Sequence, residues 1–256
     1  MTAAPPLSGC TGAEPLIAMR AISKIFKTPG GDFYALQDVN ACFYPGEFVS
    51  VVGKSGSGKS TLVNMITGID RPSRGTVCIE DVCIQELSES KMSIWRGRNL
   101  GVVFQFFQLL PMLSLHENVM LPMDFANRYD PKERPERALE LLRMVGLEQA
   151  AHKLPAAVSG GQQQSAAIAR ALANDPPILV ADEPTGNLDS RTAASVFGIF
   201  DALVARGKTI LMVTHDPALA RRTHRMLELV DGRLSGQETL RSTEQAHRPS
   251  EEAQRP

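Results

Sequence analysis

The chain has 256 residues, with 27 basic against 28 acidic side chains and a formal net charge of −1. This balance gives no electrostatic reason to expect nucleic acid or an anionic membrane surface as a partner, and no apolar run approaches the roughly 20 residues that span a bilayer. We expect a soluble chain that forms one large domain or a domain with an inserted subdomain.

The two ends have the composition of unfolded segments. Residues 1–15 are small and rich in proline, and residues 237–256 are polar and contain proline. We expect both to be disordered, which leaves residues 16–236 as the folded domain. Residues 7–10 (LSGC) resemble a lipoprotein cleavage site, but neither a basic start nor an apolar run precedes them, so we do not interpret them as a signal.

The first clear strand and helix enclose a glycine-rich loop. Residues 47–53 (EFVSVVG) predict a buried strand. A helix should start at Lys59 and end at Gly68, with its apolar residues turned inward. These inward residues are Leu62, Val63 and Ile66.

The loop between them, GKSGSGKST at residues 53–61, matches the pattern G-x-x-x-x-G-K-[ST]. Glycines let the backbone N–H groups turn toward phosphate oxygens, and the helix start adds its positive dipole end. Lys59 would contact the β and γ phosphates, and Ser60 offers a hydroxyl to Mg²⁺. A glycine-rich turn that merely resembles the motif is the alternative, which the strand before it and the helix after it disfavour. The predicted nucleotide-binding residues are Gly53, Ser55, Gly56, Ser57, Gly58, Lys59, Ser60 and Thr61.

The four cysteines form neither a CxxC pair nor a ligand cluster with histidine. Two of them lie in TVCIEDVCI, which alternates like a strand, a turn and a second strand and favours packing in a sheet. We therefore predict reduced thiols in a cytosolic protein. The cysteines are Cys10, Cys42, Cys78 and Cys83.

The middle of the chain differs from its flanks. From about residue 106 to residue 158 no buried strand is predicted, whereas an amphipathic helix should end at Gly146. This block is interpreted as a helical insert. The apolar positions of the helix are Ala138, Leu141, Leu142 and Val145.

A second glycine-rich helix start follows the insert. Ser159 and Gln162 have the spacing of a capping box, and Gly160 and Gly161 leave bare backbone N–H groups, which form a second anion site. One nucleotide does not need two such helix ends from distant parts of one chain. We infer that two copies meet, each helix start capping the nucleotide that the other holds. An ordinary capped surface helix remains the alternative on local sequence.

The last third alternates again. Residues 178–182 (ILVAD) and 209–215 (TILMVTH) predict buried strands, and the helix between them should end near Gly207. This strand–helix–strand unit implies a parallel sheet with helices on its faces. The inward helix positions are Val196, Ile199, Phe200, Leu203 and Val204.

Acidic residues end the first of these strands, at the edge where ligands bind parallel sheets. Asp182 is predicted to hold Mg²⁺, usually through water, and Glu183 to orient or deprotonate an attacking water. His215 ends the neighbouring strand and could bond the γ-phosphate and sense its loss. No comparable support exists for the other histidines, His116, His152, His224 and His247.

In combination and order, these motifs resemble the ATP-binding cassette (ABC) ATPase family over roughly residues 16–236. The matching segments are residues 53–61 (Walker A), Gln105 (Q-loop), VSGGQQ from Val158 (signature), ILVADE (Walker B), Asn187 to Asp189 (D-loop) and His215 (H-loop).

The resemblance implies an α/β fold: a P-loop NTPase RecA-like core with an antiparallel β-subdomain and an inserted α-helical subdomain at about residues 106–158. It also implies ATP hydrolysis in a head-to-tail dimer that encloses two ATP molecules. In the family an aromatic residue before the first core strand stacks on adenine; Phe26 is similar in position, and Tyr34 ranks below it. The implied catalytic residues are Glu183, His215 and Gln105. The implied Mg²⁺ ligands are Ser60, Gln105 and Asp182. The implied contacts to the other copy's nucleotide come from Ser159, Gly160, Gly161, Gln162 and Asp189.

Within the family, DEPTGNLDS, SGGQQQ and FFQLLPMLSLHENVMLP resemble the macrolide-export and lipoprotein-release group. The expected role is the ATPase subunit of a transporter or mechanotransmission complex, cytoplasmic and held on the inner face of the membrane by a permease. The permease would insert a coupling helix near Leu109, Leu110, Pro111 and Leu115. The alternatives are a soluble ABC ATPase that is not coupled to transport, or a weakly hydrolysing nucleotide-binding module.

One residue departs from the family pattern. Ser165 stands where arginine is usual, directly after the glutamines of the signature. Serine cannot replace the charge of arginine or its fork of donors. This departure puts in doubt how firmly the signature helix is tied to its surroundings, and with it the hydrolysis rate.

Overall fold

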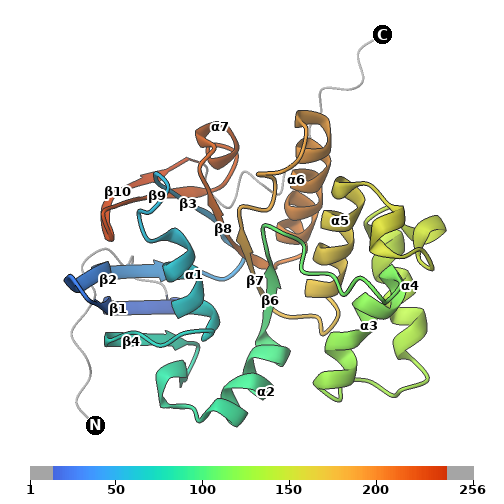
Figure 1. Ribbon diagram of the computed structural model, residues 1–256, viewed down its shortest axis with the longest axis horizontal. Helices are drawn as coiled ribbons and strands as arrows, with labels where there is room; N and C mark the ends of the chain where they lie inside the picture. The colour runs from blue at the N-terminus through green and yellow to red at the C-terminus, as the bar shows by residue number, and fades with distance from the viewer. Residues whose placement is uncertain (1–13, 241–256) are drawn as a thin grey trace.

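The computed structural model describes residues 14–240, so the expectations for residues 1–13 and 241–256, including the LSGC stretch, lie outside the described residues. Two sheets and the helices around them make up this part of the chain (Figure 1). The strands are β1 (Ile17–Thr28), β2 (Gly31–Phe43), β3 (Phe48–Val52), β4 (Arg74–Ile79), β5 (Val82–Cys83), β6 (Leu100–Val103), β7 (Ile178–Asp182), β8 (Thr209–Thr214), β9 (Arg225–Val230) and β10 (Arg233–Thr239).

The four predicted helices are present as α1, α4, α5 and α6, whereas α2, α3 and α7 were not predicted individually. Short 3₁₀ helices, η1 to η3, connect some of the α-helices. The bounds are α1 (Lys59–Thr67), η1 (Ile84–Glu86), α2 (Glu89–Asn99), α3 (Leu115–Phe125), α4 (Arg134–Met144), η2 (Glu148–Ala150), η3 (Pro155–Ala157), α5 (Gly160–Ala171), α6 (Ser190–Ala205) and α7 (Pro217–Ala220).

The larger sheet has the order β10-β9-β3-β8-β7-β6, and all its neighbouring pairs are parallel except β10 with β9. The three strands predicted as buried runs, β3, β7 and β8, lie inside it. Their register sets Val52 beside Thr214 and Asp182 beside Val213, so their carboxyl ends share one edge. The predicted parallel strand–helix–strand unit, β7–α6–β8, is confirmed.

The smaller sheet, in the order β2-β1-β4-β5, is antiparallel. In Figure 1 helix α1 lies between this sheet and the larger one, and its apolar face joins both in one core. A second core packs α6 and the end of α5 against the opposite face of the larger sheet, around Phe48, Phe197 and Phe200. The arrangement confirms the expected core and β-subdomain.

The helical insert follows β6. Residues 104–159 contain no strand, and α3 and α4 pack with the inner face of α5 in a third core. Ser114 and Glu117 form a reciprocal capping box that starts α3. Helix α4 ends at Met144, two residues before Gly146, whose φ of +74° is the left-handed conformation that stops helices.

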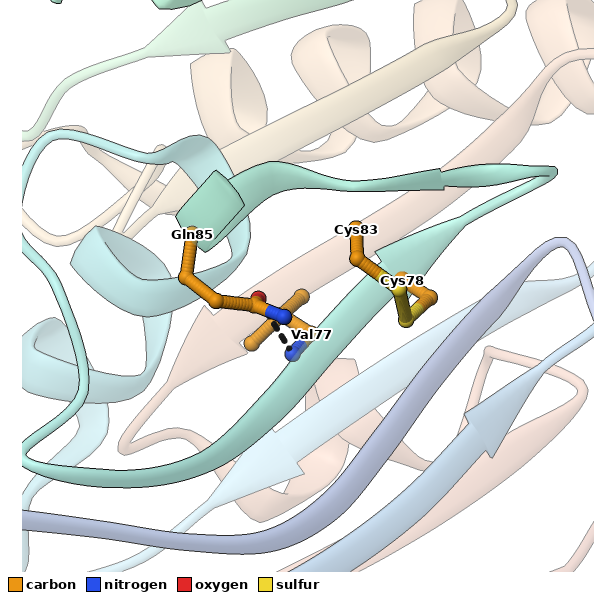
Figure 2. Close-up of a disulfide and its surroundings, with 4 residues drawn as sticks. All are labelled: Val77, Cys78, Cys83 and Gln85. Carbon is orange, nitrogen blue, oxygen red and sulfur yellow. Dashed lines mark hydrogen bonds between the residues drawn. A yellow bond between two sulfur atoms is a disulfide. The ribbon is translucent and has the colours of Figure 1, made fainter. Parts of the chain in front are cut away.

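The cysteine prediction is partly wrong. Strands β4 and β5 confirm the strand–turn–strand pattern, but Cys78 and Cys83 form a disulfide (Figure 2). The two residues are direct cross-strand partners, with Cα atoms 3.9 Å apart, so the hairpin register itself brings the sulfurs together. Gln85 Oε1 also accepts a hydrogen bond from the Val77 backbone N at 3.0 Å, which ties η1 to β4. None of the cysteines in the described range is free.

The ordered chain extends slightly beyond the boundary expected at residue 236. Strand β10 continues to Thr239 because it pairs with β9, and the Leu240 N–H donates to the His224 carbonyl at 2.8 Å. Between residues 14 and 240, no helix has the length and apolar composition that crossing a bilayer requires.

Candidate active site

The glycine-rich loop joins β3 to α1 in a conformation that side chains would obstruct. Gly56 and Gly58 have φ angles of +81° and +103°. A Cβ on Gly58 would lie 2.4 Å from the Ala35 carbonyl oxygen, and one on Gly53 would lie 2.3 Å from the Leu229 carbonyl oxygen. Both contacts are far shorter than real Cβ atoms allow, so packing as well as backbone conformation requires glycine here.

Lys59 starts α1 with its side chain folded over the loop. The residue is buried, and its Nζ donates to the carbonyl oxygens of Gly53 at 2.8 Å and Lys54 at 3.0 Å. The ammonium group therefore lies within the curve of the loop. That is the position from which a lysine can contact phosphate oxygens.

A cavity of about 640 Å³ opens beside this loop. It collects predicted site residues from five separate parts of the chain, so the fold brings together what the motifs only suggested. Two predicted residues of the loop, Gly53 and Ser57, do not line the cavity, and the buried Ser57 Oγ lacks a hydrogen-bond partner. The lining residues are Phe26, Phe33, Ala35, Ser55, Gly56, Gly58, Lys59, Ser60, Thr61, Gln105, Glu183 and His215.

Two aromatic residues line the cavity, only one of which was predicted. Phe26 on β1 and Phe33 on β2 are direct cross-strand partners, and both are exposed. Tyr34 pairs with Ile25 and does not line the cavity, because successive side chains of a strand point to opposite faces. The ranking of Phe26 above Tyr34 agrees with this geometry, whereas Phe33 was missed. The Pro-Gly-Gly turn at residues 29–31 was the signal that could have paired the two phenylalanines.

Asp182 ends β7 with one carboxylate oxygen unsatisfied. Its Oδ1 is buried and has no hydrogen-bond partner. Burial raises the pKa of this carboxyl above its ordinary value, and the charge of Glu183 adds to the rise. A hydrogen bond with Ser60 acts in the opposite direction. A carboxylate oxygen without a partner next to a hydroxyl is a donor set that fits a hard cation.

The protein side of this metal site is sparse. Within residues 14–240, no three His, Cys, Asp or Glu side chains cluster closely enough to hold a metal ion by themselves. Mg²⁺ commonly binds through one or two protein ligands together with nucleotide phosphates and water. Ser60 and Asp182, which share a hydrogen bond, fit that requirement. Ser60 and Gln105 line the cavity, whereas Asp182 lies behind Ser60 and does not line it.

Glu183 and His215 meet at the carboxyl ends of β7 and β8. The Nδ1 atom of His215 lies 2.8 Å from Glu183 Oε2, and the His215 backbone N–H donates to the same oxygen at 3.3 Å. Glu183 has a φ of +48°, which costs about 1–3 kcal/mol in a non-glycine residue. Its side chain is mostly buried, while that of His215 is exposed. The pair thus presents a held carboxylate and an accessible imidazole to the cavity.

The other described histidines lie elsewhere. The rings of His116 and His152 lie 5.5 Å apart between centroids, tilted by 47°, in the helical insert. His224 Nδ1 accepts a hydrogen bond from the Phe48 N–H at 3.2 Å inside the sheet. His247 is outside the described residues.

The second helix start has the predicted capping box. Ser159 Oγ accepts from the Gln162 N–H at 3.3 Å, and Gln162 Oε1 accepts from the Ser159 N–H at 3.0 Å. Gly161 has a further reason to be glycine, because a Cβ there would lie 2.2 Å from Thr192 Cγ2 on α6. Thr192 Oγ1 in turn donates at 2.6 Å to Asp189, the N-cap of α6. The sequence shows none of this packing.

The two glycine-rich helix starts do not meet in one chain. None of residues 159–162 lines the cavity next to Lys59, and Asp189 does not either. In Figure 1, α5 and α1 lie on opposite sides of β6, β7 and β8. Each chain thus has a phosphate loop with its cavity and, separately, an exposed helix start.

Comparisons with known proteins agree with this site. A family model described as "ABC transporter" matches residues 36–186. The uncharacterized ABC transporter ATP-binding protein MJ0796 of Methanocaldococcus jannaschii is 45% identical over 231 residues, which are 88% of this chain and 98% of that protein. The lipoprotein-releasing system ATP-binding protein LolD 2 of Caulobacter vibrioides is 41% identical over 87% of this chain and 97% of that protein.

A solved structure is also similar. It is the dimeric post-hydrolysis state of the ATP-binding cassette MJ0796 bound to ADP and Pi, with a TM-score of 0.83 and 43% identity over 88% of this chain and 99% of that one. The fold is therefore that of a P-loop NTPase cassette, as expected from the motifs. The motifs, the cavity and these relatives together establish that this chain belongs to the ABC transporter family, as an ATP-binding cassette with ATPase activity.

Proposed function

We propose that this chain is the ATPase subunit of an ABC transporter or mechanotransmission complex, and that it works as a head-to-tail dimer around two ATP molecules. The observation that carries the proposal is the separation, in one chain, of the phosphate-loop cavity from the exposed helix start at Ser159. A second copy would bring its Ser159–Gly161 start to the first copy's cavity. The dimeric cassette MJ0796 supports this arrangement.

Within the cavity, we propose the following division of roles. Lys59 and the loop N–H groups hold the β and γ phosphates, while Phe26, with Phe33 beside it, offers an aromatic face to adenine. Ser60, Asp182 and Gln105 would hold Mg²⁺. The metal would neutralise charge that develops on the phosphate oxygens.

Glu183 would orient the attacking water or accept its proton. His215 holds Oε2 of that carboxylate and exposes its ring to the γ-phosphate position, so it can register the loss of that phosphate. Gly161 and Asp189 would serve the other copy's nucleotide. The contact between Glu183 and His215, and the position of both residues in the cavity lining, support these assignments.

A second cavity, of about 550 Å³, supports a membrane partner. It lies between the core and the insert, with an apolar lining that includes Ile94 on α2 and Phe125 on α3, whose exposed fractions are 56% and 84%. We propose that an apolar segment of the permease docks here and holds the chain on the cytoplasmic face of the membrane. Of the apolar residues named for the coupling helix, Leu110 is exposed, whereas Leu115 is fully buried in the core of the insert and can offer no surface to a permease.

The dimer is tested with Glu183→Gln, which should bind ATP but not hydrolyse it. In size exclusion with Mg²⁺ and ATP the variant should elute at the mass of a dimer, and with ADP at that of a monomer. Lys59→Ala in the same background is the matched control and should stay monomeric with ATP. A Glu183→Gln chain that remains monomeric with Mg²⁺ and ATP, even when its permease is supplied, would contradict the dimer.

A further inference from the structure

The segment after Gln105 has a backbone that its residue types disfavour. Phe107 and Gln108 have φ angles of +54° and +53°. In this left-handed region the Cβ of an L-residue crowds its own backbone. Two successive non-glycine residues stay there only where their surroundings hold them.

Arg170, near the end of α5, provides such a hold. Its Nη2 donates to the Phe107 carbonyl oxygen at 2.7 Å, and its Nη1 donates to the carbonyl oxygen of Gln108. A guanidinium directs two N–H groups to two neighbouring acceptors in one plane, which a lysine ammonium does not. Arg170 is half-buried, and burial lowers the pKa of its guanidinium.

The same segment also touches the other end of α5. A Cβ on Gly160 would lie 3.7 Å from Phe107 Cζ, so the phenylalanine ring lies against the signature start. Gly160 precedes Arg170 by ten residues, about 15 Å along a helix. Because helical side chains lean toward the N-terminus, Arg170 can reach back to the same phenylalanine.

Gln105 is thus held on both sides. Before the left-handed pair, its own carbonyl accepts a hydrogen bond from Asn187 Nδ2 at 3.4 Å, in the loop after β7. On the other side of Gln105, Arg170 holds the carbonyls of Phe107 and Gln108 against α5. Gln108 and Arg170 also line the second cavity, where the permease is proposed to dock.

We propose that Arg170 is a positioning residue for ATP hydrolysis. It holds the backbone at Phe107 and Gln108 so that Gln105 enters the nucleotide cavity in one orientation, and it links that orientation to the signature start at Gly160. A permease segment in the second cavity would contact Gln108 and Arg170 directly. The inference rests on the proposed function, in which Gln105 and Gly160 serve the two halves of the ATP site.

The test is Arg170→Met, which keeps an unbranched apolar stem and removes both donors. We expect kcat for Mg²⁺–ATP hydrolysis to fall about tenfold or more, as for a misplaced catalytic group, with KM for ATP changed less than about twofold. Adding Gln108→Gly should recover part of the lost kcat, since glycine adopts positive φ without strain. The kcat of Arg170→Lys should lie between those of the parent and of Arg170→Met, because one ammonium group does not span both carbonyls.

Arg137→Met is the matched control. Arg137 Nε donates to the Ala173 carbonyl at 2.9 Å just beyond the C-terminal end of α5, and its guanidinium stacks on Tyr129 at 4.4 Å, in the insert. Its removal should lower Tm about as much as Arg170→Met but leave kcat within about twofold.

Two results would overturn the proposal: a kcat for Arg170→Met within about twofold of the parent, or an equal loss of kcat in Arg137→Met. If Arg170→Met does not fold, Arg170→Lys with and without Gln108→Gly decides by the same criterion. A different result would count against the proposed function: the parent chain hydrolyses ATP, but Glu183→Gln stays monomeric with Mg²⁺ and ATP.

Discussion

The starts of α1 and α5 are both glycine-rich, yet they are prepared for a ligand to different degrees. The first four backbone N–H groups of an α-helix have no partner within the helix. At α1 the N-cap is Gly58, and no side chain caps the helix. At α5 the capping box satisfies the N–H groups of Ser159 and Gln162, which leaves those of Gly160 and Gly161. The α1 start, with a buried lysine beside it, is the stronger anion site.

This difference implies an order of events. A nucleotide should bind first at the α1 cavity of a single chain, where loop, lysine and aromatic residues act together. The α5 start of a second copy, with two free N–H groups and an exposed position, would add to a nucleotide already held. Closure of the dimer would therefore depend on nucleotide binding and not precede it.

One alanine at each helix start gives the largest expected difference between the two sites. In Gly58→Ala the new Cβ meets the Ala35 carbonyl at a positive φ, so we expect the affinity of the single chain for ATP to fall about 100-fold or more. In Gly161→Ala that affinity should stay unchanged, while ATP-dependent dimerisation is lost. Titration with a fluorescent ATP analogue and size exclusion, both in the Glu183→Gln background, measure the two effects.

A second substitution separates the causes at Gly161. Thr192→Ser removes the Cγ2 atom that a new Cβ would meet at 2.2 Å and keeps the hydroxyl that bonds Asp189. If Gly161→Ala fails because α5 and α6 are pushed apart, the double variant should dimerise again. A Gly161→Ala chain that weakens nucleotide binding as much as Gly58→Ala would remove the distinction between the two starts.

The aromatic residues of the α1 cavity sharpen the comparison at a smaller scale. Stacking contributes about 0.5–1.5 kcal/mol, so Phe33→Ala should weaken ATP binding about two- to tenfold if the ring lies against the base. Tyr34→Ala, on the other face of the same strand, is the control and should bind like the parent. The same fluorescent titration tests both, and equal losses in the two variants would show that Phe33 has no special contact.

Sequence patterns predicted the features that depend on neighbours along the chain. Some features depend only on residues that lie close together in the sequence, and the structure places them as expected. They are the phosphate loop, the capping box at Ser159 and the strand ends at Asp182 and His215. The parallel sheet followed from the same local signals. The lack of a predicted buried strand between about residues 106 and 158, together with an amphipathic pattern ending at Gly146, also indicated the helical insert.

Features that depend on distant partners were out of reach. The contact of Gly161 with Thr192 joins two helices, and Phe33 enters the cavity only through the register of a hairpin. Arg170 looks like an ordinary helix residue until its carbonyl acceptors are known. The disulfide at Cys78 likewise depends on exact cross-strand pairing, which alternation alone does not specify.

The smallest expected effect concerns Ser165 within α5. The residue is half-buried in the signature helix, where the family usually has arginine. Ser165→Arg should preserve or raise ATPase activity, because arginine favours a helix by about 0.5 kcal/mol or less over serine and adds donors near the signature start. Ser165→Ala removes the hydroxyl without adding a charge, so it separates the loss of the hydroxyl from the effect of the added arginine.

If kcat collapses in both variants, the serine hydroxyl has a role of its own. If only arginine lowers kcat, the surroundings of α5 in this chain have adapted to a small residue. Either result would mean that the surroundings of α5 in this chain differ from those usual in the family. The cavity beside α1 should bind ATP equally in the parent, Ser165→Arg and Ser165→Ala.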